Sequence, residues 1–121
     1  MVWRGVLLKQ SLEDEELLKL VHILKKDISM LEKEFRIITF YNIEVEDSKK
    51  EEFVQKAIKA IKPKFYIHIV KDGVMYVIFK DKMFKFRKND PQLNEAREYG
   101  KSIGIIPEQM LFEHLIDHPF D

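Results

Sequence analysis

The stretch FYIHIVKDGVMYVIFKDKMFKF, residues 65–86, decides the fold because it holds three apolar runs separated by two short polar turns. The runs 64–70, 74–79 and 83–87 are rich in β-branched and aromatic residues, which favour extended strands. Turns of two or three residues join neighbouring antiparallel strands. The sequence therefore predicts an antiparallel three-stranded meander.

Turn chemistry predicts how the first two strands of this meander pair. The loop 71–73, Lys-Asp-Gly, ends in a glycine that suits the left-handed position of a three-residue hairpin loop. This loop sets Val70 opposite Val74. It also places three apolar pairs on one side of the sheet, namely Phe65–Phe79, Ile67–Val77 and Ile69–Met75.

A two-residue loop, Asp72-Gly73, is the rival. It would set His68 opposite Val77 and mix the two sides of the sheet, because a slip of one residue turns a strand over. We therefore expect the three-residue loop. We expect the second turn to be centred on Asp81-Lys82, which extends the apolar side with the pairs Phe79–Phe84 and Val77–Phe86.

This register predicts a candidate ligand site on the second side of the meander. His68, Tyr76 and Arg87 fall in one row across the three strands, and Tyr66 and Lys85 fall in the next row. Such donors can hold a phosphate or a carboxylate. A nearby guanidinium would also lower the pKa of His68 and favour a neutral general base. The alternative is a half-covered sheet side with ordinary cross-strand pairs.

Outside the meander, periodicity and capping signals predict the other elements. Apolar residues recur every three or four positions over 11–31, the period of a helix face. Asp90-Pro91 opens a later helix and Gly104 closes it. The remaining predictions are strands 2–8 and 35–46 and helices 49–61 and 107–116.

These elements predict a single α+β domain over residues 1–121, in the order β-α-β-α-β-β-β-α-α. The length of 121 residues fits one hydrophobic core. Two β-α-β units would be right-handed crossovers joining parallel strands. We therefore expect one mixed five-stranded sheet with helices packed on it.

Composition excludes several classes of protein. The chain has no cysteine, which rules out disulfides, thiol nucleophiles and zinc ribbons. No apolar run is long enough to cross a bilayer, and no signal peptide is expected, so we predict a cytoplasmic location. The composition, rich in Lys, Glu and Ile, favours a thermophilic source.

Charge is segregated along the chain although the net charge is zero. Residues 49–88 contain 12 basic and 4 acidic groups, a net charge of +8. A basic face of this kind attracts an anion, unless the acidic ends fold against it.

Two other groups of residues suggest alternative functions, namely RNA binding and metal binding. The basic segment 80–88 alternates with aromatic residues, a pattern that can bind RNA by stacking, although the predicted register turns those aromatics toward the core. His114, Asp117 and His118 have the spacing H-x-x-D-H, which is similar to an inverted zinc motif. Two histidines alone are a weak signal, so we predict no metal and no cofactor. There is no Walker loop, dinucleotide fingerprint or serine-hydrolase motif.

Four strings in the sequence resemble parts of a family of small uncharacterised prokaryotic proteins. They are WRGVLL (3–8), VIFKDKMFKF (77–86), EAREYGKSIGI (95–105) and DHPFD (117–121). The resemblance implies a stand-alone small prokaryotic domain and no particular activity.

The leading functional hypothesis is a non-catalytic module that binds a small anionic ligand or a protein partner through His68, Tyr76, Arg87, Tyr66 and Lys85. The alternative is a small enzyme with His68 as general base and Arg87 as anion anchor. Homodimerisation through the second side of the meander, or through the edge 83–87, is also expected.

Overall fold

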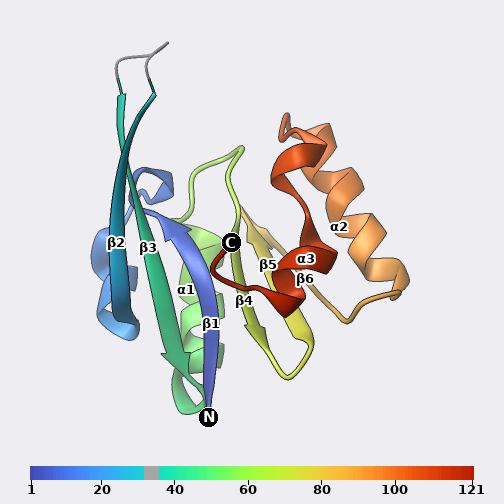
Figure 1. Cartoon of the computed structure of the whole chain (residues 1–121), viewed down its shortest axis with the longest axis horizontal. Helices are drawn as coiled ribbons and strands as arrows, with labels where there is room; N and C mark the ends of the chain where they lie inside the picture. The colour runs from blue at the N-terminus through green and yellow to red at the C-terminus, as the bar shows by residue number, and fades with distance from the viewer. Residues whose placement is uncertain (32–35) are drawn as a thin grey trace.

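One antiparallel sheet organises the computed structural model, which describes the backbone of residues 1–31 and 36–121 and the side chains of residues 1–28 and 38–121. The strands lie in the order β2-β3-β1-β4-β5-β6 (Figure 1). They are β1 (Val2–Leu8), β2 (His22–Leu31), β3 (Arg36–Glu46), β4 (Ile67–Lys71), β5 (Val74–Phe79) and β6 (Lys82–Phe86).

Three α-helices and four short 3-10 helices complete the described part of the chain. The α-helices are α1 (Lys50–Ala60), α2 (Pro91–Ser102) and α3 (Phe112–Asp117). The 3-10 helices are η1 (Lys9–Ser11), η2 (Glu15–Leu20), η3 (Asp47–Lys49) and η4 (Pro107–Gln109). Within the described residues, no helix combines the length and the apolar character that crossing a membrane requires.

The sheet separates two hydrophobic cores. On one side, α1 packs Phe53 and Ala57 against buried residues of β1, β3, β4 and β5. On the other side, α2 and α3 bury Leu93 and Phe112 against β4, β5 and β6. Figure 1 shows α2 and α3 over the half of the sheet that holds β5 and β6, away from β2 and β3. The α+β class is therefore confirmed, and β4 and β5 are covered on both sides.

The predicted helix over residues 11–31 is wrong. The structure has two 3-10 helices there, followed by β2, which pairs antiparallel with β3 from His22 to Leu31. A stripe with helical spacing is only a weak preference, and long-range pairing with a neighbouring strand can override it. Because β2 adds a strand, the sheet has six strands rather than the predicted five.

The predicted parallel crossovers are also wrong. β1 lies between β3 and β4 and is antiparallel to both. Helix α1 therefore connects two strands that run in the same direction but do not pair with each other. The prediction failed because alternation of strands and helices in the sequence does not say which strands become neighbours.

The meander exists, but its first turn is the two-residue loop Asp72-Gly73. Both residues have positive φ, 50° and 79°, as a type I′ turn requires. Ile69 therefore pairs with Tyr76, and His68 pairs with Val77. Apolar residues do not distinguish the two registers, because both sides of β4 and β5 are buried. Turn geometry, which matches the twist of the strands, decided the register instead.

The second turn lies at Lys80-Asp81, one position before the predicted Asp81-Lys82, because Phe79 pairs with Lys82. Asp81 has a φ of 62°, in the left-handed region. The predicted pairs Phe79–Phe84 and Val77–Phe86 are therefore wrong, because Val77 pairs with Phe84 and Phe79 pairs with Lys82. Each partner moves by two residues, which keeps every side chain on its predicted side. Val77, Phe79, Phe84 and Phe86 consequently share one side of the sheet, as predicted.

Gly73→Ala should destabilise the fold by about 1–2 kcal/mol, because an L side chain is strained at positive φ. Asp72→Asn is the matched control, since Asn tolerates the left-handed region. Urea denaturation of both variants checks the effect. Equal unfolding midpoints for the two variants would contradict the type I′ turn.

The C-terminal helices follow the predicted boundaries in part. α2 begins at Pro91 after Asp90, and Gly104 adopts a φ of 100° just beyond its end. The predicted last helix, 107–116, is instead split into η4 and α3, with Met110 and Leu111 between them. Both Met110 and the first residue of α3, Phe112, are fully buried, so the break turns both side chains into the core.

Candidate functional site

His68 is buried beneath the C-terminal segment. Its side of β4 faces α3, and the residue is 5% exposed. The ring Nε2 lies 2.8 Å from the carbonyl oxygen of Pro119, so a neutral ring with the proton on Nε2 can donate to it. Burial lowers the pKa of His68 to about 4, although the hydrogen bond to Pro119 acts in the opposite direction. The ring is inaccessible to a substrate, which argues against His68 as a general base.

Tyr66 lies on the same side as His68, with 6.3 Å between the two ring centroids. Its hydroxyl donates to the carbonyl oxygen of Gln109, and burial raises the pKa of Tyr66 to about 12. The Tyr66 ring also packs edge-to-face on Phe112 at 5.7 Å. This pair of predicted ligand residues therefore anchors the C-terminal segment on the sheet.

Tyr76 and Lys85 lie on the opposite side of the sheet, where α1 packs. They are direct cross-strand partners between β5 and β6, and the Lys85 ammonium lies 5.6 Å from the Tyr76 ring centroid. Arg87 donates from Nη1 to the carbonyl oxygen of Asp72 at 3.1 Å, at the β4–β5 turn.

The predicted row of His68, Tyr76 and Arg87 therefore does not form. The reason is the two-residue turn, which moves Tyr76 to the other side of the sheet from His68. Of the five predicted ligand residues, Tyr76 and Lys85 contact each other on the α1 side, whereas Tyr66 and His68 lie together on the opposite side.

Three lysines surround Trp3 and Tyr76 on the α1 side of the sheet, and we call Lys50, Lys71 and Lys85 the lysine cluster. The Lys50 ammonium lies 4.9 Å from the Tyr76 ring centroid, 5.6 Å from that of Trp3 and 3.0 Å from the Tyr76 hydroxyl. The Lys71 ammonium lies 5.4 Å from the Trp3 ring centroid. The two aromatic rings themselves meet edge-to-face at 5.2 Å. Cations held over aromatic faces gain electrostatic stabilisation from the rings.

Asp47 holds part of this arrangement in place. Its Oδ1 accepts from the Trp3 indole nitrogen at 2.9 Å and from the Lys71 ammonium at 2.8 Å. The hydrogen bond from Lys71, followed by that from Trp3, lowers the pKa of Asp47. Lys50 pairs with the Glu51 carboxylate, and the hydrogen bond between them raises the pKa of Lys50. Two carboxylates therefore face three ammonium groups, and one positive charge is left over.

The sequence pattern did not identify Lys50, Lys71, Asp47 and Trp3 as members of this site. They come from β1, η3, the start of α1 and the end of β4. The excess of basic residues over 49–88 was the one relevant signal, because that segment contains all three members of the lysine cluster. The sequence pattern could not show that they converge on Trp3, which lies outside that segment.

The C-terminal histidines do lie together, as their spacing indicated. The rings of His114 and His118 have centroids 4.7 Å apart, and His114 Nε2 lies 2.9 Å from Asp121 Oδ2. Asp117 instead pairs with Lys88, whose hydrogen bond lowers the pKa of that carboxyl. Among the residues that the structure describes, no group of three or more His, Asp or Glu side chains is arranged to hold a metal ion.

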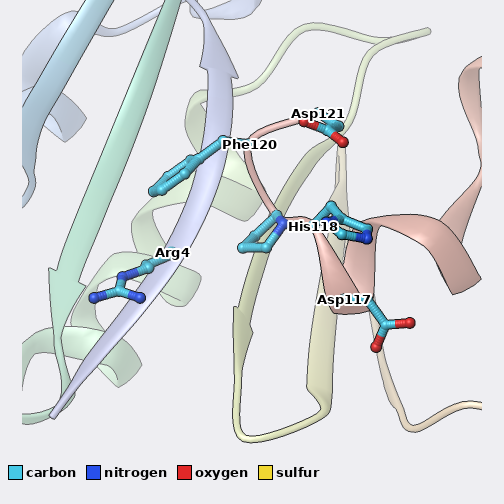
Figure 2. A pocket seen from close by; sticks show the side chains of 6 residues that line it. Arg4, Asp117, His118, Phe120 and Asp121 are labelled. Carbon is cyan, nitrogen blue, oxygen red and sulfur yellow. The ribbon is translucent and has the colours of Figure 1, made fainter.

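A shallow hollow of about 270 Å³ lies between β1 and the C-terminal segment. Figure 2 shows Phe120 reaching across β1 on the side where Arg4 lies, with His118 and Asp121 on the facing segment. Glu44 already pairs with Arg4 at 3.1 Å, so the guanidinium is neutralised within the sheet. The hollow therefore provides less uncompensated positive charge for binding an anion than the lysine cluster does.

Comparison with known proteins found no family model, no curated protein and no solved structure that matches this chain.

Proposed function

We propose that the protein is a non-catalytic module that binds a small anion at the lysine cluster. The main support for this proposal is that three ammonium groups converge on Trp3 and Tyr76, whereas only two carboxylates among the described side chains pair with them. A phosphate or carboxylate would replace the missing negative charge and accept charge-assisted hydrogen bonds.

Two of the three lysines, Lys50 and Lys71, are held in position before any ligand binds. Asp47 holds Lys71, and the Tyr76 hydroxyl holds Lys50, whose side chain is only 14% exposed. Holding the donors in place reduces the side-chain entropy that binding would otherwise cost. Lys85 is exposed, and none of the ion pairs among the described side chains includes it, so its ammonium can turn toward a ligand.

The other two functional hypotheses have less support. An enzyme with His68 as general base needs a reachable imidazole, whereas this ring is buried and bonded to Pro119. RNA binding through 80–88 needs exposed aromatic faces, whereas Phe86 is 2% exposed and Phe84 packs on Phe79 and Tyr99. We therefore retain the anion-binding hypothesis.

Lys71→Gln should weaken the binding of inorganic pyrophosphate by about tenfold or more, because a charge-assisted hydrogen bond contributes about 1.5–3 kcal/mol. Titration at low ionic strength, followed by the NMR signal of the indole N–H, measures the effect. Trp3 is the single tryptophan, and its indole bonds to the same carboxylate oxygen as Lys71.

Lys62→Gln is the matched control, because it removes one exposed lysine outside the cluster. It should bind pyrophosphate as the wild type does. No shift of the Trp3 signal in the wild-type protein would contradict the proposal. Equal weakening by both variants would also contradict it, since that pattern indicates general charge attraction rather than a site.

A further inference from the structure

Strand β2 forms one edge of the sheet and pairs with β3 on one side only (Figure 1). Its outer edge carries a row of backbone N–H and C=O groups that another strand can pair with. The strand is ten residues long, which is more than a protein usually leaves unpaired at an edge.

Exposed apolar side chains gather on β2. Ile23 is 46% exposed, Leu24 is 51% exposed and Ile28 is 63% exposed. On the opposite edge strand, β6, Met83 is the one large apolar residue with an exposed side chain. The side of the meander that carries His68, an expected dimer surface, is covered by α2 and α3. The surface best suited to a partner strand is therefore β2 rather than the predicted edge 83–87.

Charge selects one register if the partner strand is β2 of a second copy. Two residues that face each other in an antiparallel pair point to the same side of the sheet. In a two-fold pair of identical strands, one central residue must therefore face the same residue of the other copy, and the axis passes beside it. An axis at Lys25 would set Leu24 against Lys26, and an axis at Asp27 would set Lys26 against Ile28. An axis at Lys26 sets Lys25 against Asp27 twice, and Leu24 against Ile28.

Both Lys25 and Asp27 point to the side of the sheet away from α1. They pair with Asn42 and Phe40 of β3, which alternate with the buried Tyr41 and Ile43. Lys25 already lies 3.6 Å from Asp27 of its own strand, with both side chains exposed. In the register centred on Lys26, the two such pairs of the two copies form an alternating cluster of four charges on that side. Lys26 faces its own copy on the α1 side, where its flexible stem lets the two ammonium groups separate into solvent.

We propose that the protein forms a two-fold dimer in which β2 pairs antiparallel with β2 of a second copy, centred on Lys26. The pairing joins the two sheets into one continuous sheet. Because the axis passes beside Lys26, the contact runs from Leu24 to Ile28, and it ends at the bulge that interrupts the β2–β3 register between Ile23 and Lys25. Opposite charges that face each other across the strands hold the register, and the exposed apolar residues supply the buried area.

The test exchanges the two charges. Lys25→Asp and Asp27→Lys each place like charges opposite each other at two symmetric positions, and each should raise the dimer dissociation constant by about tenfold or more. The double variant K25D/D27K restores opposite charges and should return the constant to within about threefold of the wild type. Sedimentation velocity over a range of protein concentrations measures all four proteins.

The matched control exchanges another surface ion pair, Glu16 with Lys19 on η2, whose side chains are 65% and 74% exposed. The double variant E16K/K19E should dimerise as the wild type does. A wild-type chain that stays monomeric overturns the proposal. So does a dimer that the single variants leave unchanged, or a correctly folded K25D/D27K protein that stays monomeric.

Discussion

Gly5→Ala should lower the free energy of unfolding by about 3 kcal/mol or more, the largest effect we expect from any single methyl group in this chain. Gly5 lies in the centre of the sheet on β1, between Ile43 of β3 and Ile69 of β4. A Cβ at this position would lie 1.8 Å from the carbonyl oxygen of His68 and 3.2 Å from the Cα of Ile69. Both neighbours are backbone atoms, so the strands themselves would have to move apart.

Gly100→Ala is the control for this prediction. Its added Cβ would lie 2.3 Å from the sulfur of Met110, which belongs to an unbranched and adaptable side chain. Alanine also favours the helix by about 1 kcal/mol over glycine, which offsets part of the cost. Urea denaturation followed by circular dichroism compares the two variants. A Gly5→Ala protein within about 1 kcal/mol of the wild type would contradict the close approach of β1 and β4.

Acidification from about pH 6.5 to pH 4 should cost about 3 kcal/mol of stability through His68 alone. The folded-state pKa of about 4 lies below the ordinary value of 6.5. The neutral ring therefore stabilises the fold fully above pH 6.5, and this contribution is lost as the pH falls toward 4. Burial is the cause, because a charged ring beneath the C-terminal segment would lose its hydration.

His68→Gln removes this titration and leaves the exposed His22, His114 and His118 in place. As the pH falls from 6.5 to 4, the unfolding free energy of the wild type should drop by about 3 kcal/mol more than that of the variant. Urea denaturation at several pH values measures the difference. Parallel pH profiles for the two proteins would show that the His68 ring is solvated in the folded state.

Local signals in the sequence predicted helices α1 and α2. The stripe of Phe53, Val54 and Ala57 marks the buried face of α1, and the predicted helix 49–61 is confirmed as Lys50–Ala60. Asp90-Pro91 and Gly104 bound α2 as predicted. These signals work because hydrogen bonds within a helix, and the conformations that begin and end it, involve residues close together in the chain.

The candidate site was predictable only in part. The sequence indicated that Tyr76 and Lys85 would both lie away from the core of the meander, yet it assigned Tyr76 to the row of His68. The error came from a hairpin loop one residue too long, and one residue is enough to reverse a strand. Helix α1 covers one side of the meander, and α2 and α3 cover the other, so both sides carry apolar residues. The apolar pattern was therefore compatible with either register.

By itself, the sequence determined an α+β chain with a C-terminal meander, one amphipathic helix before it and helices after it, because periodicity, turns and caps are local. Only the tertiary structure decided that 22–31 is a strand, that β1 lies between β3 and β4, and that Lys50, Lys71 and Lys85 meet at Trp3 and Tyr76. The physical reason is that strand pairing and charge convergence depend on contacts between residues far apart in the chain, which no local pattern records.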